Sequence, residues 1–198
     1  MIVGKPKLNG FLKILYRVSF YIICAVYIVI AFFFVFDSGK RIFIYPLKFK
    51  NEISFYCEEY KLEKPLIFAL IKTESNFNDK AESTKGAKGL MQLTEKTAAY
   101  IASLRKIETY DIFDVETNID FGCFYYKYLR GKFTDSFTAL AAYNAGEGIV
   151  SVWLQNPNYS TDKTTLINIP YPETKAYIKK IKKSFENYTN LYGNILDK

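Results

Sequence analysis

The stretch PLIFALIKTES, residues 65–75, decides how this chain folds and where its chemistry lies. It is apolar from Pro65 to Ile71, which predicts a buried helix that runs to Glu74. A carboxyl that follows an apolar turn is partly desolvated, and desolvation raises its pKa because the charged form is penalised. A glutamate with a pKa near 6 is protonated in about one molecule in ten at pH 7. A glutamate with the reference pKa of about 4.3 is protonated in only roughly one molecule in 500. Glu74 is therefore predicted to be a general acid.

The rest of the chain beyond residue 50 also has helical spacing, because apolar residues recur at three and four positions and strand signals are sparse. Asp114 is a plausible N-cap for one of these helices. The loops at 76–88 and 156–170 are long enough to bind a ligand. We predict one all-α domain with at most a minimal β element. Besides 65–74, the predicted helices are 51–60, 94–103, 115–132, 136–143, 149–155 and 173–192.

Residues 18–36 form an uncharged, mostly apolar run. As a helix it would span about 28 Å, close to the roughly 30 Å of bilayer hydrocarbon. A buried core helix rarely runs this long without a polar face. No small-residue cleavage site follows, so an uncleaved anchor is predicted rather than a signal peptide.

Basic residues precede the run, and the positive-inside rule then predicts a cytoplasmic N-terminus and an extracytoplasmic domain. The expected division is a basic N-terminus at 1–17, a transmembrane anchor at 18–36, a connector at 37–50 and a catalytic domain at 51–198. The basic residues before the run are Lys5, Lys7, Lys13 and Arg17.

The charge gives no case for a nucleic-acid partner. Of 27 basic residues, four precede the run, which leaves 23 against 20 acidic ones. Such a mildly basic surface would suit an anionic wall polymer, although ordinary solvated charges explain it equally.

The chain has no histidine, which excludes Ser-His-Asp and Cys-His nucleophile systems and the usual histidine-bearing metal sites. We expect no metal and no cofactor. Cys57 and Cys123 either form a disulfide or are separately buried as small apolar residues, and their spacing gives no zinc signature. Catalysis is expected to depend on carboxylates, hydroxyls and amides.

Three further clusters carry groups that suit a polyhydroxylated ligand. The segment STKGAKGLMQ, residues 83–92, ends in Met91 and Gln92. These two residues can form an adaptable apolar wall beside an amide that binds the ligand. Alternatively, Met91 is a core residue and Gln92 caps a helix. AAYNAGEG, residues 141–148, brings Tyr143 and Asn144 to a helix end, although a tyrosine there can equally be core. PETKAY, residues 172–177, starts a helix with proline and an acid, which needs no function.

Taken in order, these motifs resemble the soluble lytic transglycosylase family, peptidoglycan-cleaving enzymes with a goose-type-lysozyme-like fold. The resemblance covers about residues 51–183 and runs through Glu-Ser, Gly-Leu-Met-Gln, Ala-Tyr-Asn-Ala-Gly and Glu-Thr-x-x-Tyr. Asp79, Thr84 and Val115 replace prolines common in the family, which affects loop stiffness and substrate fit more than chemistry.

The resemblance implies roles for individual residues. Glu74 falls on the catalytic acid, and Tyr143 is expected to hydrogen-bond to it. Met91 would line the sugar face, and Glu173 would either contact the substrate or hold Tyr177 or a loop. The implied substrate-binding positions are Ser83, Met91, Gln92, Tyr143, Asn144, Glu173 and Tyr177.

The resemblance also implies a reaction on peptidoglycan glycan strands. Glu74 would protonate the β-1,4 glycosidic oxygen between N-acetylmuramic acid and N-acetylglucosamine, then deprotonate the muramoyl C6 hydroxyl to close a 1,6-anhydro ring. The substrate's N-acetyl group would stabilise the anomeric carbon. Two alternatives stay open: a muramidase-type hydrolase on the same fold, which needs a second carboxylate, and a non-catalytic, membrane-tethered peptidoglycan-binding protein.

Overall fold

The computed structural model describes residues 10–196 and divides the chain at Pro46 into two units. Lys5 and Lys7, in the predicted cytoplasmic segment 1–17, lie outside the described residues.

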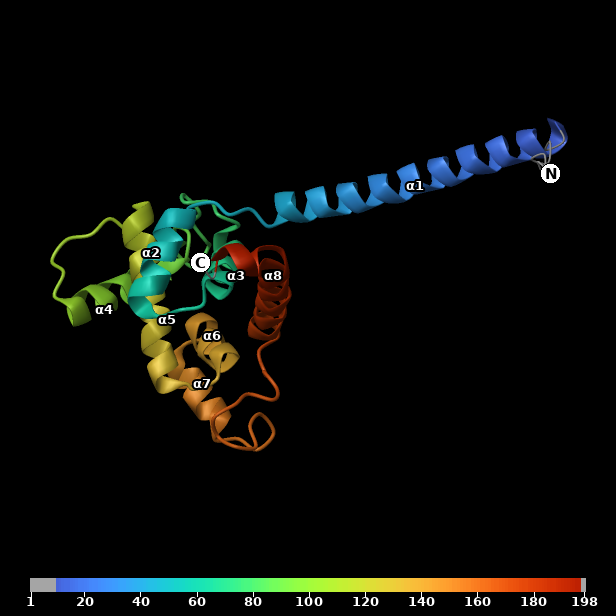
Figure 1. The fold of residues 1–198 in the computed structure, drawn as a ribbon. Coiled ribbons are helices and arrows are strands. Elements are labelled where there is room, and N and C mark those ends of the chain that lie inside the picture. The colour runs from blue at the N-terminus through green and yellow to red at the C-terminus, as the bar shows by residue number, and fades with distance from the viewer. Residues whose placement is uncertain (1–9, 197–198) are drawn as a thin grey trace. The chain divides into compact units, whose positions relative to one another are not determined.

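The N-terminal unit contains one long helix, α1, from Gly10 to Ile44 (Figure 1). Its 22-residue segment Leu12–Phe33 is long and apolar enough to cross a membrane and is not buried by protein. A signal sequence near an N-terminus would meet the same criteria of length and composition. The helix continues through the first part of the predicted connector at 37–50 and ends at Ile44.

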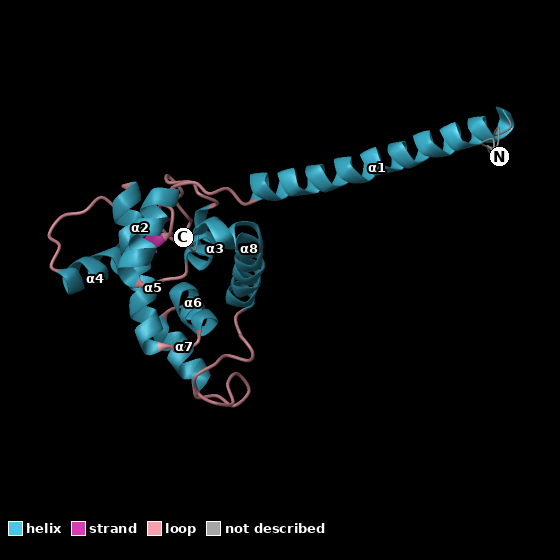
Figure 2. Cartoon of the chain, viewed as in Figure 1, coloured by secondary structure: helices cyan, strands magenta, loops and turns pink. Residues whose placement is uncertain are grey.

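The second unit is helical apart from one short hairpin, which confirms the predicted fold class (Figure 2). All seven helices predicted beyond residue 50 are present, with ends that differ by a few residues. In the hairpin, Ala87 pairs with Thr94 in antiparallel register. The elements are α2 Lys50–Tyr60, α3 Lys64–Ser75, β1 Ala87–Lys88, β2 Leu93–Thr94, α4 Glu95–Arg105, α5 Val115–Lys132, α6 Ser136–Ala145, α7 Glu147–Leu154 and α8 Pro172–Leu196.

The apolar part of helix α3 is buried on all sides. Every residue from Pro65 to Ile71 is buried, as a helix that is apolar on all sides requires. Helix α8 lies against it (Figure 1), and the rings of Phe68 and Tyr188 meet with centroids 5.4 Å apart. This packing places the last turn of α3, which carries Glu74, beside the first turns of α8.

Three helices begin at a residue whose side chain accepts a backbone N–H. Thr94 caps α4 by accepting from Thr97, and Asp135 caps α6. Asp114, the predicted N-cap, accepts from the N–H of Thr117 at the start of α5. Each such cap typically contributes about 1 kcal/mol to helix stability.

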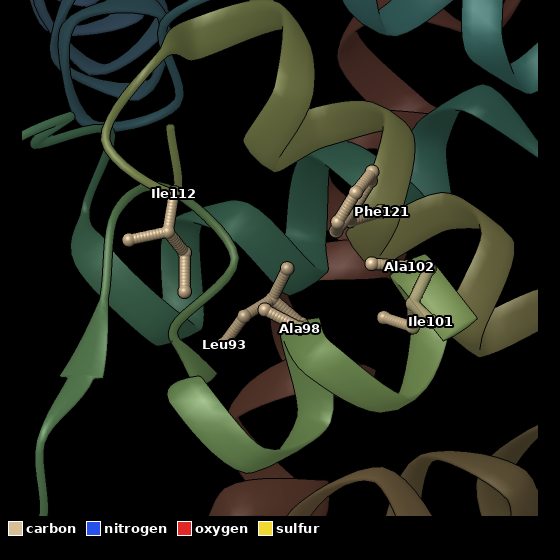
Figure 3. Close-up of a cluster of buried hydrophobic side chains, with 6 residues drawn as sticks. All are labelled: Leu93, Ala98, Ile101, Ala102, Ile112 and Phe121. Atoms are coloured by element: carbon tan, nitrogen blue, oxygen red, sulfur yellow. The ribbon is translucent and has the colours of Figure 1, made fainter. Parts of the chain in front are cut away.

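A buried apolar cluster fixes the hairpin and α4 against α5 (Figure 3). Tyr125 and Tyr143 pack against this cluster while remaining partly accessible. The cluster therefore supports one wall of the site described below. Its members are Leu93, Ala98, Ile101, Ala102, Ile112 and Phe121.

Cys57 in α2 and Cys123 in α5 are both buried, and both are free thiols. Burial raises the pKa of the Cys123 thiol, as does its interaction with Cys57. Of the two alternatives, the structure has the small buried residues rather than the disulfide.

Candidate active site

Glu74 lies in the last turn of α3, where the buried face of the helix ends. The hydroxyl of Tyr177 in α8 donates to Glu74 Oε1 at 2.6 Å. Burial raises the pKa of Glu74 to about 7, and the Tyr177 hydrogen bond opposes this shift without overcoming it. The predicted direction of the shift is confirmed, and its cause is the predicted desolvation.

Glu74 opens into a cavity of about 220 Å³. Five of the predicted substrate-binding residues line it with Glu74, although they come from three separate regions of the sequence. They are Ser83, Gln92, Tyr143, Asn144 and Glu173. The other lining residues, which the sequence analysis did not identify, are Lys85, Ala87, Leu93, Thr94, Thr97 and Tyr125.

The loop that forms one wall is held by its own side chains. Ser83 Oγ accepts from the N–H of Ala87 at 3.0 Å. Gln92, at φ 49°, donates from Nε2 to the carbonyls of Ala81 and Gly89 at 3.2 and 3.0 Å. Because this amide nitrogen is bound to backbone, the amide oxygen is the group of Gln92 best suited to bind a ligand.

Met91 does not line the cavity, and its prediction as a sugar-facing wall is wrong. Its side chain is fully buried and packs against Gly122 of α5, where an added Cβ would lie 2.2 Å from Met91 Sδ. Met91 is therefore a core residue that keeps α5 and the loop in close contact.

The predicted hydrogen bond between Tyr143 and Glu74 is also wrong. Tyr143 donates instead to the carbonyl of Met91 at 2.9 Å, and Tyr177 supplies the bond to Glu74. The reason is that α8 packs along α3, whereas Tyr143 at the end of α6 faces the loop at 83–92. Tyr143 still lies near the acid, since burial and the Glu74 charge both raise its pKa.

Asn144 and Glu173 join neighbouring parts of the cavity wall. Asn144 Oδ1 accepts from Thr174 Oγ1 at 2.8 Å, which links α6 to α8. Lys85 Nζ donates to both carboxylate oxygens of Glu173, at 3.0 Å to Oε1 and 3.1 Å to Oε2. Of the two structural partners predicted for Glu173, a loop or Tyr177, the structure has the loop.

Asn118 supports the loop from within the core, and the sequence analysis missed it. Its Oδ1 accepts from the N–H of Met91 at 2.8 Å, and its Nδ2 donates to the carbonyls of Lys88 and Ile112 at 3.1 and 2.7 Å. Gly89, at φ 74°, lies so close that an added Cβ would be 2.2 Å from Asn118 Nδ2. A polar residue one turn before Gly122 in the predicted helix at 115–132 was the signal that could have identified it, because a polar group that becomes buried needs hydrogen-bond partners.

Within residues 10–196, no group of three or more acidic or cysteine side chains is arranged to hold a metal ion. The ionisable groups that line the cavity are Glu74, Lys85, Tyr125, Tyr143 and Glu173.

The fold and this cavity define a lysozyme-like helical domain built around a half-buried acid with a raised pKa. The chain belongs to the transglycosylase SLT domain family, which it matches over residues 52–166.

Relatives in this family include both soluble and membrane-bound proteins. The chain is 31% identical over 155 residues to the soluble lytic murein transglycosylase of Salmonella typhimurium, covering 75% of this chain and 24% of that protein. It is 27% identical over 175 residues to the membrane-bound lytic murein transglycosylase C of Edwardsiella ictaluri, covering 73% and 47%. The chain thus spans about a quarter of the soluble relative and about half of the membrane-bound one.

Solved structures agree with this assignment. The 70 kDa soluble lytic transglycosylase of Escherichia coli superposes with a TM-score of 0.66 at 29% identity, over 74% of this chain and 25% of that one. An inactive mutant of the lytic transglycosylase Slt from Pseudomonas aeruginosa gives 0.65 at 28% identity, over 74% and 24%. A similar solved structure is that of the 70 kDa soluble lytic transglycosylase in complex with bulgecin A, with a TM-score of 0.66 at 29% identity.

Proposed function

We propose that this protein is a membrane-anchored lytic transglycosylase. It would cleave the β-1,4 bond between N-acetylmuramic acid and N-acetylglucosamine in peptidoglycan and leave 1,6-anhydro-muramoyl ends, as part of cell-wall remodelling. The observation that carries the proposal is Glu74, a carboxyl with a pKa of about 7 at the wall of a polar cavity. Membership of the transglycosylase SLT domain family supports the choice of reaction.

A pKa of about 7 suits a group that must act in both protonation states. In the first step protonated Glu74 donates to the glycosidic oxygen, the bond between that oxygen and C1 of the muramoyl residue breaks, and N-acetylglucosamine leaves with a free C4 hydroxyl. In the second step its carboxylate accepts the proton of the muramoyl C6 hydroxyl, and attack of that oxygen on C1 closes the anhydro ring. The proton returns to Glu74, so the reaction consumes no water.

Tyr177 positions the acid for these two steps. Its hydroxyl donates to Oε1, so the transferable proton of the neutral carboxyl belongs on Oε2. The hydrogen bond also limits how far burial raises the pKa of Glu74. Tyr177 is therefore a positioning residue rather than a direct substrate contact.

The remaining polar lining groups suit an N-acetylated sugar. Ser83, Gln92 and Asn144 present hydroxyl and amide groups to the cavity, and these can bind N-acetyl or hydroxyl groups of the substrate. The N-acetyl group of the muramoyl residue would stabilise the developing charge at C1, which removes the need for an enzyme nucleophile.

The surroundings of Glu173 favour a lyase over a hydrolase. An inverting hydrolase needs a second carboxylate about 6.5–9.5 Å from the acid to activate water. Among the described lining residues the only other carboxylate is Glu173, and it is exposed and paired with Lys85 Nζ at 3.0 Å. An ion-paired, solvated carboxylate at the cavity rim is a poor base for this purpose.

Digestion of purified peptidoglycan by the full-length protein in detergent, followed by mass spectrometry, tests the proposal. We expect anhydro-muropeptides from the wild type, none from Glu74→Gln, and the same products from the matched variant Glu173→Gln. Reducing-end products that disappear in Glu173→Gln would establish the hydrolase instead. Binding without any turnover by the wild type would establish the non-catalytic alternative.

We further propose that residues 18–36 anchor the protein, with the N-terminus cytoplasmic and the domain outside the membrane. The exposed apolar segment Leu12–Phe33 supports membrane insertion, and Lys13 and Arg17 near its start support the orientation. Protease added to intact cells should digest the domain. Digestion only after permeabilisation would refute the topology, and a mature N-terminus beyond Phe36 would identify a cleaved signal sequence.

A further inference from the structure

The cavity at Glu74 is too small to hold a polymer by itself. Its volume is about 220 Å³, below the roughly 300–1,000 Å³ of pockets that enclose a drug-sized ligand. A glycan strand bound at Glu74 must therefore also lie on surfaces that flank the cavity. The proposal that follows depends on the proposed function, since it concerns the same strand.

One flank is a row of tyrosines that begins inside the cavity. Tyr125 lines the cavity, and its ring lies 5.4 Å from that of Tyr143, centroid to centroid. On its other side the ring of Tyr128, one helical turn further along α5, lies 6.1 Å away and nearly parallel, at 14°. Tyr128, which does not line the cavity, is thus in ring contact with a residue that does.

Tyr100 of α4 extends this row across to the neighbouring helix. Its hydroxyl donates to the hydroxyl of Tyr128 at 2.9 Å, and the two rings meet edge to face at 5.8 Å. Tyr100 is 41% exposed, whereas the core tyrosines Tyr126 and Tyr188 are 2% and 0% exposed. We call Tyr100, Tyr125 and Tyr128 the tyrosine row.

An ion pair supports the outer end of the tyrosine row. Lys132 Nζ lies 4.6 Å from the ring centroid of Tyr128 and 2.8 Å from a carboxylate oxygen of Glu147. These contacts raise the pKa of Lys132, which keeps the ammonium charged against the ring. A ring held by an ammonium group and a neighbouring hydroxyl is ordered before any ligand arrives, which lowers the entropic cost of binding.

We propose that the tyrosine row is an extended subsite that binds the glycan strand outside the acid cavity. In β-1,4-linked N-acetylglucosamine and N-acetylmuramic acid the polar ring substituents are equatorial, so the faces of the rings present C–H groups. Such faces pack on aromatic rings, while tyrosine hydroxyls at the ring edge bind sugar hydroxyls. The row offers both kinds of group, and its member Tyr125 lines the same cavity as Glu74.

Core packing alone does not explain the tyrosine row. Tyr125 and Tyr143 do pack on the buried cluster, but Tyr100 and Tyr128 lie outside that cluster. A hydroxyl-to-hydroxyl bond at an exposed position contributes little to stability, because water can replace either partner. Binding of a glycan strand, which has both polar and apolar surfaces, would explain why the rings and hydroxyls of the tyrosine row lie together.

Binding of peptidoglycan-derived glycans to the full-length Glu74→Gln protein in detergent tests the subsite without interference from turnover. The probes are a muramic-acid-containing tetrasaccharide and long peptide-free glycan strands, measured by calorimetry. We expect Tyr100→Ala, added to this background, to weaken binding of the long strands roughly 3- to 10-fold, the size of a lost aromatic contact. The effect should be smaller for the tetrasaccharide, because it has fewer sugars outside the cavity.

Several variants separate ring contacts from other causes. Tyr100→Phe should retain most of the affinity, because the ring remains, and Tyr128→Leu should weaken binding like Tyr100→Ala while preserving most of the packed volume. Phe55→Ala is the matched control, since Phe55 is an exposed aromatic residue, 62% exposed, on α2 and does not line the cavity. Thermal unfolding followed by the sole tryptophan, Trp153, verifies that each variant is folded.

The outcomes distinguish this proposal from the proposed function. Unchanged affinity in folded Tyr100→Ala and Tyr128→Leu, or a loss equal for both probes, would overturn the subsite. Cleavage by the wild type that depends on Glu74 would leave the lyase assignment intact in that case. Conversely, length-dependent loss of binding would uphold the subsite even if the wild type produced no anhydro ends.

Discussion

Helices α1 and α3 are both strongly apolar, yet they have opposite relations to their surroundings. In α1 no part of the segment Leu12–Phe33 is buried by protein, whereas in α3 every residue from Pro65 to Ile71 is buried. Length explains the difference, because 22 residues can span a bilayer and a 12-residue helix cannot. Apolar composition alone therefore does not determine whether a helix lies in lipid or inside a protein. Because α3 is too short to span a bilayer, other helices must cover it.

The largest effect is expected from charged residues in α1, because they should prevent its apolar segment from staying in a membrane. Ile22→Lys combined with Val26→Lys puts two ammonium groups near the middle of the apolar segment, at a cost of about 2.5–3.5 kcal/mol each. We expect the double variant to leave the membrane fraction on alkaline extraction. The control with leucine at both positions should remain there. If the lysine variant stays in the membrane pellet, α1 is not what holds the protein at the membrane.

A smaller effect is expected from equal truncations in the two helices. Ile67 in α3 is 0% exposed and Ile28 in α1 is 67% exposed. Ile67→Ala should lower the free energy of unfolding of the domain by about 2–5 kcal/mol, because it leaves a cavity in the core. Ile28→Ala should leave that free energy unchanged.

Urea unfolding in detergent measures this difference. The only tryptophan, Trp153, lies in the domain and is 6% exposed, so its fluorescence reports unfolding of the domain alone. Equal midpoints for the two variants would mean that α3 is not the packed centre of the domain.

The smallest predicted effect concerns the one acid at the end of the buried helix. Folding raises the pKa of Glu74 from its usual 4.5 to about 7, so the fold favours the protonated form. The resulting stability is fully present below about pH 4.5 and is lost as the pH rises through about 7. Because glutamine cannot ionise, Glu74→Gln should be more stable than the wild type at pH 8, by roughly 3 kcal/mol at most.

Unfolding midpoints at pH 4.5 and pH 8 measure the gain, which should grow with pH. Glu173→Gln serves as the control, because Glu173 is exposed and its ion pair with Lys85 contributes little. A Glu74→Gln protein that is no more stable than the wild type at pH 8 would show that the acid is not desolvated in the fold. Higher stability of Glu74→Gln at pH 8 would also mean that the ionisable Glu74 lowers the stability of the wild-type protein at that pH.

Much of the fold and part of the site followed from local patterns. The helices, the Asp114 cap and the direction of the Glu74 pKa shift depend mainly on neighbouring residues, so sequence reasoning identified them. Ordered motifs also identified five residues that line the cavity with Glu74. Whether a side chain such as Met91 faces the cavity or the core depends on the backbone turn at Gly89 and Gln92, where φ is positive. Local spacing does not determine that orientation.

Partners across long sequence separations could not be predicted in the same way. Tyr143 was the predicted partner of Glu74, whereas the actual partner, Tyr177, lies 103 residues away in the chain and reaches Glu74 only because α8 packs along α3. Asn118 was missed for a related reason, because its three hydrogen bonds reach a loop about 27–30 residues earlier and a turn six residues earlier. The tyrosine row likewise exists only because α4 and α5 bring Tyr100 to Tyr128.

A long apolar N-terminal helix, a helical domain and one acid after an apolar turn could all be predicted from the amino-acid sequence. These properties follow from periodicity, length and local desolvation, which neighbouring residues control. The packed domain was needed to establish that Tyr177 rather than Tyr143 holds Glu74, that Met91 is core, and that Glu173 pairs with Lys85. Those outcomes depend on side-chain directions after the helices have packed, and packing is a property of the whole domain.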